Sequence, residues 1–479
     1  MARHSCSPRS LAELLNDAML SAEVVGGDTV VTGVTQDSRD VQPGDIYCCI
    51  RGQHFDGHMY AHDAVTSGAV AVIADREIPG LFEGVVVVRV ADVREFIGMF
   101  ASALFGYPSR QLQMIGVTGT NGKTTTTALI SSIVEASGKS VRQIGTLTGA
   151  RTTPEAIDLQ AQLRECVDAG VASVVMEVSS HALVQGRVRG VEFDVSVFTN
   201  LGRDHLDFHG TEEAYFAAKA KLFAPDLSRH GVVNVDDPRG SLLRDAATIP
   251  MTGFSVSDVR LVDMRVDAVT YEWNNHTVTV PMGGSFTLMN SLAAATAARV
   301  LGIDDDAIVR GLASVSQVPG RFESVPNKSG FGVIVDYAHT PESLESLLTS
   351  VRQICRGRII VVFGCGGNRD AGKRPLMGRI AESHADVVIV TSDNPRDEDP
   401  QHIINEICSG FTTSSTTISQ VSERDLAIES AIRHAMRDDI VVIVGKGHET
   451  YQEVSGVMHP FSDVDVAKKA LQRREETTE

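Results

Sequence analysis

One local feature constrains the fold more than any other. A short apolar run, Gln113–Val117, leads into a glycine-rich segment and then into a stretch with helical composition. A strand, a tight turn and a helix in that order bring backbone N–H groups and a helix N-terminus together, which is how proteins bind phosphate. The turn consists of Thr118, Gly119, Thr120, Asn121, Gly122, Lys123 and Thr124.

The residue types in this turn fit the chemistry of a nucleotide site. Gly119 and Gly122 let the backbone approach phosphate oxygens, Lys123 neutralises their charge, and the Thr124 hydroxyl is a ligand for Mg²⁺. The common spacing G-x-x-x-x-G-K-[ST] is not met, because Val117 stands where the first glycine is expected. The segment is therefore a variant phosphate-binding loop. On this motif alone, a structural glycine turn with an incidental lysine stays open as the alternative.

The rest of the chain alternates strand-like and helix-like stretches, which predicts an α/β protein. Its 479 residues correspond to about three domains. We expect an N-terminal α/β domain over 1–107, a central P-loop ATPase domain with a parallel sheet over 108–318, and a Rossmann-like C-terminal domain over 319–479. Several strands are apolar on both faces, as in a parallel sheet covered by helices on both sides. They are Val171–Val178, Asp194–Phe198, Val333–Tyr337, Arg358–Phe363, Asp386–Thr391 and Asp439–Val444.

Composition excludes several classes of protein. Lys and Arg total 43 against 61 Asp and Glu, and the net charge of −18 disfavours nucleic acid as a partner. No apolar run approaches the roughly 20 residues of a membrane helix, and the N-terminus has no signal-peptide core, so we expect a cytoplasmic protein. Seven cysteines without a C-x-x-C pair fit reduced, buried thiols.

Two further strand ends carry candidate metal ligands. Glu177 and His205 both follow apolar runs, and ligands of open α/β sheets bind at the carboxyl ends of the strands. Mg²⁺ prefers carboxylate and hydroxyl oxygens and tolerates an imidazole. Taken singly, each residue is more often an ordinary strand-end side chain; beside the glycine-rich loop, a shared metal site becomes the better interpretation.

The third domain places four polar or glycine-rich segments at strand ends. They contain two cations, Arg369 and Arg396, and two anions, Asp393 and Glu449. A guanidinium grips a carboxylate through two parallel hydrogen bonds, and a carboxylate accepts from an ammonium, so the set suits a zwitterionic ligand. The alternative is a dinucleotide loop at 364–367, but the G-x-G-x-x-G spacing is missing.

Six motifs in order along the chain resemble those of the Mur ligases, the ATP-dependent enzymes that build the peptide of bacterial cell-wall precursors. They are TGTNGKTT from Thr118, EVSSH from Glu177, TNLGRDHLDFHG from Thr199, YFAAKAKLF from Tyr215, NSLAA from Asn290 and DYAHTP from Asp336. The segments TQDSR from Thr35, RTTP from Arg151, QGR from Gln185 and GKGHETYQ from Gly445 are similar to the branch that extends the UDP-linked dipeptide. The DNPR stretch from Asp393 is similar to the diaminopimelate-adding subtype.

The resemblance implies an activity. It is the ATP-dependent addition of meso-2,6-diaminopimelate to the D-glutamate γ-carboxylate of UDP-N-acetylmuramoyl-L-Ala-D-Glu, through an acyl phosphate, in peptidoglycan synthesis. Arg396 makes diaminopimelate the reasonable acceptor, because this molecule ends in a second carboxylate-bearing head whereas lysine ends in a bare ammonium. The implied cofactors are ATP and Mg²⁺, and we expect a monomer whose domains close around the substrates.

The resemblance also implies residue roles. Lys123, Lys219, His205 and Glu177 are the expected catalytic residues, and Lys219 is expected to be carbamylated. The expected metal residues are Thr124, Glu177, His205 and Lys219. The expected nucleotide contacts outside the loop are Asn290, Arg321 and Asp336. The UDP-sugar peptide is assigned to Ser38, Arg39, Thr152, Thr153, Ser179, Gln185 and Arg187. Diaminopimelate is assigned to Arg369, Asp393, Asn394, Pro395, Arg396, Gly445 and Glu449.

Alternatives remain at this stage. Thr287 and Asn368 depart from the residues common in the family, which leaves details of the adenine side open. The same reaction with L-lysine or another diamino acid is one alternative, and a folylpolyglutamate-type ligase, which would not carry the module at 1–107, is a second. A P-loop protein that binds nucleotide without forming a bond is a third.

Overall fold

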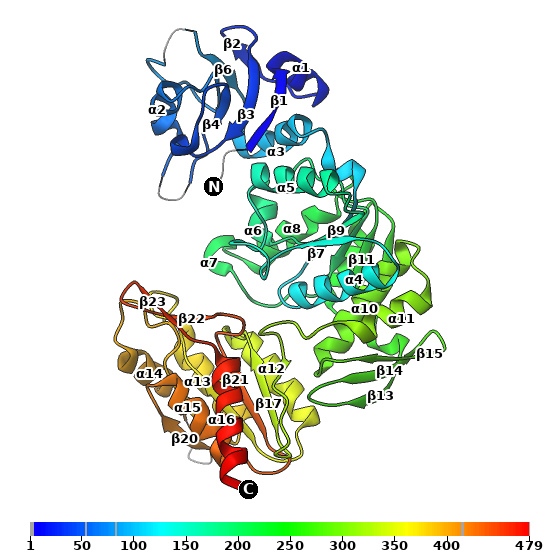
Figure 1. The fold of residues 1–479 in the computed structure, drawn as a ribbon, viewed down its shortest axis with the longest axis vertical. Helices are drawn as coiled ribbons and strands as arrows, with labels where there is room; N and C mark the ends of the chain where they lie inside the picture. The colour runs from blue at the N-terminus through cyan, green and yellow to red at the C-terminus, as the bar shows by residue number, and fades with distance from the viewer. Residues whose placement is uncertain (1–3, 53–54, 82–83, 413–415, 479) are drawn as a thin grey trace.

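The computed structural model describes residues 4–52, 55–81, 84–412 and 416–478. Three six-stranded sheets follow one another along the chain, and Figure 1 shows them as three successive bodies: N-terminal in blue, central in cyan to green, C-terminal in yellow to red. None of the described helices is both long enough and apolar enough to span a membrane. The predicted three-domain α/β class is confirmed.

The N-terminal sheet has four parallel strands flanked by two antiparallel edges, in the order β1-β3-β4-β5-β6-β2. Ser10 caps the first helix by accepting a hydrogen bond from the N–H of Glu13. The strands are β1 (His4–Ser10), β2 (Glu23–Val25), β3 (Val30–Thr35), β4 (Asp45–Cys48), β5 (Ala71–Ala74) and β6 (Val86–Arg89). The helices are α1 (Leu11–Asp17), α2 (Ala61–Thr66) and α3 (Val93–Leu104).

The central sheet is entirely parallel, in the order β12-β11-β10-β7-β9-β8. Its strands are β7 (Gln113–Thr118), β8 (Val141–Ile144), β9 (Ser173–Glu177), β10 (Val195–Phe198), β11 (Gly231–Asn234) and β12 (Met251–Phe254). Its helices are α4 (Lys123–Ala136), α5 (Ala156–Asp168), α6 (Ser180–Val184), α7 (Leu206–His209), α8 (Glu212–Ala220), α9 (Pro238–Ala246), α10 (Ser285–Val300) and α11 (Asp305–Ser314).

Alternate side chains of β7 belong to two different cores. Ile115 and Val117 pack with α4, α10 and α11, whereas Met114 packs with α5 on the other face. Because both faces are covered, the strand is apolar throughout, as predicted for a parallel sheet. An antiparallel meander follows this sheet and consists of β13 (Arg260–Met264), β14 (Val269–Trp273) and β15 (His276–Val280).

The C-terminal sheet has five parallel strands and one antiparallel edge strand, in the order β16-β17-β21-β18-β19-β20. Its strands are β16 (Glu323–Ser324), β17 (Gly332–Asp336), β18 (Ile359–Phe363), β19 (Val387–Val390), β20 (Thr417–Gln420) and β21 (Ile440–Val444). Its helices are α12 (Pro341–Ile354), α13 (Lys373–His384), α14 (Pro400–Cys408), α15 (Arg424–His434) and α16 (Asp463–Thr478). A separate hairpin, β22 (Tyr451–Val454) and β23 (Val457–Pro460), was not predicted from the sequence.

Candidate active site

The glycine-rich loop joins β7 to α4, and close packing explains its glycines. Gly122 has a φ of +85°, and a Cβ there would lie 2.3 Å from Oδ1 of Asn290. Gly119 has a φ of +151°, and a Cβ there would lie 1.9 Å from Oγ1 of Thr199. Any larger residue would be strained and would clash at both positions. The loop therefore has the strand–turn–helix geometry that its sequence predicts.

Two lysines converge on one backbone oxygen of this loop. Nζ of Lys123 donates to the carbonyl oxygens of Gly119 at 2.9 Å and Thr120 at 2.8 Å. Nζ of Lys219, on α8, donates to the same Gly119 oxygen at 2.8 Å. Burial lowers the pKa of Lys123, and it lowers the pKa of Lys219 well below its ordinary value, with a further contribution from the charge of Lys123. Two amine donors thus meet where a polyphosphate would bind, and the amine of Lys219 is favoured in its neutral form.

Glu177 ends β9 and faces the same loop. Its Oε2 accepts hydrogen bonds from the hydroxyls of Thr124 at 3.0 Å and Thr146 at 3.3 Å, and its Oε1 accepts the N–H of Thr146 at 2.8 Å. The residue is 1% exposed. A carboxylate and hydroxyls at one point form the hard oxygen set that Mg²⁺ prefers. Thr146 was missed by the sequence analysis.

His205 lies before α7, with its ring against that of His181 at 4.7 Å between centroids. Its Nε2 lies 3.5 Å from Oδ2 of Asp204. Burial is the main cause that lowers the pKa of both histidines, which keeps the imidazoles neutral at neutral pH. Among the residues that the structure describes, no three His, Cys, Asp or Glu side chains converge as a metal centre. The four predicted metal residues supply a carboxylate, an imidazole, a hydroxyl and a lysine.

A cavity of about 330 Å³ opens beside the loop, between the central and C-terminal domains. Its lining includes Asn121, Gly122, Phe286, Asn290, Arg321, Asp336 and Ser343. The guanidinium of Arg321 lies 4.5 Å from the ring centroid of Tyr337. Asp336 accepts the backbone N–H groups of Phe322 and Ala338 at 2.7 and 2.8 Å, and burial raises its pKa. The structure thus brings the predicted nucleotide residues of both domains to one cavity.

Most of the residues assigned to the UDP-sugar peptide form one connected group in the central domain. The hydroxyl of Thr153 donates to the carbonyl of Glu177 at 2.9 Å and accepts the N–H of Ser179 at 3.0 Å. Arg187 donates to the carbonyl of Thr153 at 3.1 Å and to Oε1 of Gln185 at 2.6 Å.

Thr152 joins the same group, because its hydroxyl lies 3.1 Å from that of Thr146. Ser38 and Arg39 lie instead in a 3₁₀ turn of the N-terminal domain, where Arg39 pairs with Asp37. No contact between described residues joins Ser38 or Arg39 to the central group.

The predicted amino-acid pocket lies at the carboxyl ends of β19 and β21. Nδ2 of Asn394 donates to Oε2 of Glu449 at 2.8 Å, and the N–H of Asn394 donates to Oδ1 of Asp393 at 2.7 Å. Nε of Arg396 donates to Oε2 of Glu453 at 2.9 Å, and its Nη1 donates to the carbonyl of Gly367 at 2.7 Å. The two predicted anions therefore share contacts with Asn394, whereas Arg396 pairs with Glu453, an anion that the sequence did not predict.

Three other predicted pocket residues border this cluster. A Cβ on Gly445, whose φ is +113°, would lie 2.5 Å from Oδ2 of Asp393. Pro395 packs so closely on Gly367 that a Cβ there would lie 1.9 Å from its carbonyl oxygen. Arg369 is exposed, and no hydrogen bond or ion pair restrains it within the described part of the chain. Its guanidinium is therefore free to meet a ligand.

A chain of rings and close backbone contacts joins the two halves of the site. The ring of Tyr337 contacts Arg321 on one side and lies 5.3 Å from the ring of His448 on the other. A Cβ on Gly320 would lie 2.1 Å from the backbone nitrogen of His448. The linker between the domains therefore packs directly on the loop that carries Glu449.

The groups that line this site can be compared with those that ATP and Mg²⁺ require. The glycine-rich loop lies beside a cavity, and this arrangement fits a polyphosphate. The contact between Thr124 and Glu177 supplies oxygens of the kind that Mg²⁺ binds. The residues present fit both groups.

A parallel α/β sheet that carries a glycine-rich loop, with a nucleotide-sized cavity facing a second polar pocket, defines a P-loop enzyme with two substrate sites. Three family models match the chain: Mur ligase family, catalytic domain over 30–104; Mur ligase middle domain over 117–298; and Mur ligase, glutamate ligase domain over 320–447. The chain belongs to the Mur ligase family.

Known proteins resemble the chain over nearly its full length. The UDP-N-acetylmuramoyl-L-alanyl-D-glutamate--2,6-diaminopimelate ligase of Geobacillus kaustophilus is 42% identical over 94% of this chain and 96% of its own. A solved structure of a UDP-N-acetylmuramoyl-L-alanyl-D-glutamate--2,6-diaminopimelate ligase is 33% identical over 92% of this chain and 95% of its own, with a TM-score of 0.66.

The folylpolyglutamate synthase of Mycobacterium tuberculosis shares the fold more distantly. It is 17% identical, has a TM-score of 0.58, and covers 78% of this chain and 93% of its own. That likeness concerns the fold alone.

Sequence reasoning missed several residues that build the pocket. Lys446 was quoted within a motif but received no role, although its side chain is fully buried between Asn394 and Glu449. Glu453 was also missed, because the hairpin that carries it was not predicted. For Lys446 a signal existed, since a lysine between two glycines directly after a buried strand is placed close to the sheet edge.

Proposed function

We propose that the protein joins meso-2,6-diaminopimelate to the D-glutamate γ-carboxylate of UDP-N-acetylmuramoyl-L-alanyl-D-glutamate, with hydrolysis of ATP, in cytoplasmic peptidoglycan synthesis. Relatives named UDP-N-acetylmuramoyl-L-alanyl-D-glutamate--2,6-diaminopimelate ligase match 92–96% of the chain at 40–42% identity. The observation that carries the proposal is that Asn394 contacts Glu449 and Arg396 pairs with Glu453 at the carboxyl edge of the same sheet whose Asp336 lines the nucleotide cavity.

The reaction proceeds in two steps. An oxygen of the γ-carboxylate attacks the γ-phosphorus of ATP, ADP leaves, and an acyl phosphate remains. The amine then attacks the acyl carbon, phosphate leaves, and the nitrogen loses its proton. Because both steps move charge between oxygens, the protein contributes mainly by positioning the reactants and neutralising charge.

The loop residues have different roles in phosphate binding. Backbone N–H groups of 119–124 hold the phosphate oxygens, and Lys123, already in the loop, turns its ammonium toward them. Thr124, Glu177 and His205 would hold Mg²⁺, which would supply further positive charge to these oxygens. Asn290, Arg321 and Asp336 hold the nucleoside side of the cavity.

Lys219 is proposed to act as a carbamate. Its neutral amine adds to the carbon of CO₂ and releases one proton, which converts the neutral amine into an anion. The low pKa of the buried Lys219 supports this step, because only the unprotonated amine reacts. The resulting carboxylate completes a set of oxygen ligands that the unmodified residues lack.

The two remaining substrates are assigned to the two polar groups described above. The sugar-linked peptide binds to the central group of Thr152, Thr153, Ser179, Gln185 and Arg187. Ser38 and Arg39 bind the same ligand from the N-terminal domain. Arg396 and Arg369 bind the far carboxylate of diaminopimelate, while Glu449 and Asp393 accept its ammonium. Asn394, Pro395 and Gly445 shape the pocket around them.

The decisive experiment measures phosphate release with ATP and the UDP-linked dipeptide, in the presence of diaminopimelate, L-lysine or ornithine. Release that depends on diaminopimelate supports the proposal. Release that depends on lysine or ornithine moves the assignment to another diamino acid, and release with glutamate and a folate moves it to folylpolyglutamate synthesis. Release without any acceptor indicates a nucleotide-hydrolysing protein that forms no bond.

A further inference from the structure

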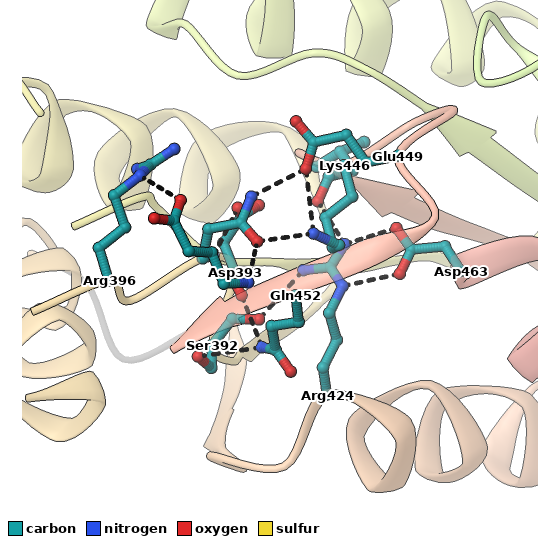
Figure 2. A network of polar contacts seen from close by, with 11 residues as sticks. Ser392, Asp393, Arg396, Arg424, Lys446, Glu449, Gln452 and Asp463 are labelled. Atoms are coloured by element: carbon teal, nitrogen blue, oxygen red, sulfur yellow. Dashed lines mark hydrogen bonds and ion pairs between the residues drawn. The ribbon is translucent and has the colours of Figure 1, made fainter. Parts of the chain in front are cut away.

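Lys446 is a buried cation that the reaction scheme above does not use. It lies two positions after the end of β21, and its side chain is 0% exposed. Its Nζ donates to Oδ1 of Asn394 at 3.0 Å and to Oε2 of Glu449 at 3.0 Å, and Figure 2 shows it at the centre of the polar network. An ammonium group without water is expensive unless partners compensate it, so these two contacts fix where the side chain lies.

The two contacts determine how the Asn394 amide is turned. Oδ1 of Asn394 accepts from Lys446 and also from the N–H of Glu453 at 2.9 Å. With two donors on the oxygen, the amide nitrogen must point the opposite way, and there it donates to Oε2 of Glu449 at 2.8 Å. A flipped amide would set two pairs of donors against each other.

The same contacts involve only one of the two carboxylate oxygens of Glu449. Oε2 accepts from both Lys446 and Asn394, whereas no donor among the described residues occupies Oε1. The side chain of Glu449 is 22% exposed, so Oε1 is within reach of a ligand. One oxygen is held by the protein and the other is offered outward, which suits an ammonium group.

A rigid base lies beneath this arrangement. Arg424 and Asp463 form an ion pair in which both side chains are 0% exposed. Arg424 also donates to the carbonyl oxygens of Ser392 at 3.3 Å and Val444 at 2.9 Å, the residues directly before Asp393 and Gly445. The pair therefore ties together the two strand ends from which the pocket loops start (Figure 2).

We infer that Lys446 is a positioning residue for the amino-acid substrate: it orients Asn394 and Glu449 so that Oε1 of Glu449 receives the substrate ammonium. This inference rests on the proposed function, in which Glu449 contacts diaminopimelate. Lys446 touches neither substrate nor nucleotide, and it acts only through its two partners.

The test is Lys446→Met, which keeps the length of the side chain and removes its charge and its donors. Loss of hydrogen bonds to a charged group should raise the KM for diaminopimelate roughly ten- to hundredfold. The KM values for ATP and for the UDP-linked dipeptide should change less than about twofold, because the phosphate loop and the central group do not contact Lys446. Lys469→Met, the same substitution at an exposed lysine of α16, is the matched control and should change none of the three.

A double-mutant cycle separates positioning from a general structural role. If Lys446 acts through Glu449, then Lys446→Met in a Glu449→Gln background should add little to the single effect, whereas independent effects would multiply. Multiplied effects, an unchanged KM for diaminopimelate, or equal rises in all three KM values would overturn the inference. Lys446→Gln, which retains an N–H donor, is made in parallel. If Lys446→Met does not fold, the same double-mutant cycle is measured with Lys446→Gln, for which we expect a smaller rise in the KM for diaminopimelate.

Failure of the underlying function has a different signature. If the wild-type protein releases phosphate without any dependence on diaminopimelate, the proposed function is wrong before any variant is measured. If the wild-type protein depends on diaminopimelate and the Lys446 variants behave like the control, only the inference about Lys446 is wrong.

Discussion

Replacing Arg396 by alanine tests the origin of specificity for a two-headed amino acid. Arg396 has a φ of +52°, so its backbone is already left-handed. Alanine carries the same Cβ, and Arg396→Ala therefore leaves the backbone strain nearly unchanged. The hydrogen bond of Arg396 to the carbonyl of Gly367 and the ion pair to Glu453 are lost, but the side chains of the ion pair are 21% and 23% exposed, so water can solvate Glu453 in the variant.

The expected loss falls on the substrate. A guanidinium–carboxylate contact contributes about 1.5–3 kcal/mol, which corresponds to a roughly ten- to 150-fold rise in the KM for diaminopimelate. The unpaired carboxylate of Glu453 would then repel the substrate carboxylate and add to the effect. Lysine lacks this carboxylate, so the preference for diaminopimelate over lysine should fall by a similar factor.

The assay is phosphate release at saturating ATP and UDP-linked dipeptide, with either diaminopimelate or lysine varied. Arg379→Ala, at an exposed arginine of α13, is the control for loss of a positive charge in the same domain. An Arg396→Ala protein with unchanged KM and unchanged preference would refute the assignment of Arg396 to the substrate carboxylate.

Three further variants test other parts of the site. Gly122→Ala places a methyl group 2.3 Å from Asn290, so nucleotide affinity measured by calorimetry should fall at least tenfold, and unchanged affinity would contradict the tight loop. Lys219→Ala should abolish phosphate release, and added formate or acetate should partly restore it, whereas Lys221→Ala should remain active; absence of rescue would argue against a carbamate. Arg424→Met leaves Asp463 buried without its partner and should lower the free energy of unfolding in urea by about 3–5 kcal/mol, and a loss below 1 kcal/mol would show that the pair is not needed.

The sequence predicted the architecture best where local pattern and packing agree. The apolar run at Gln113–Val117 became β7 because both of its faces meet helices, and the glycines after it are where close contacts with Thr199 and Asn290 demand them. Strand-end residues such as Glu177 were placed correctly, since parallel strands bring their carboxyl ends to one edge.

Partnerships between distant segments could not be predicted in this way. Nothing near Arg424 in the sequence indicates a fully buried arginine, because its partner Asp463 lies 39 positions later. Glu453 sits on a hairpin with weak alternation, and its pairing with Arg396 depends on how that hairpin folds back against the backbone at Arg396. Such contacts depend on tertiary packing, which cannot be predicted from local patterns in one amino-acid sequence.

The carbonyl oxygen of Gly119 carries a consequence beyond the geometry of the loop. It accepts from Lys123 and Lys219 together, and the charge of Lys123 is one reason why the pKa of Lys219 falls, so the amine of Lys219 is favoured in its neutral form. An anion that binds beside these two amines, whether a phosphate group or a carboxylated lysine, adds an attraction to Lys123 that the empty protein lacks. The folded enzyme should therefore gain thermal resistance from nucleotide and from dissolved CO₂ alike, because each binds the folded state.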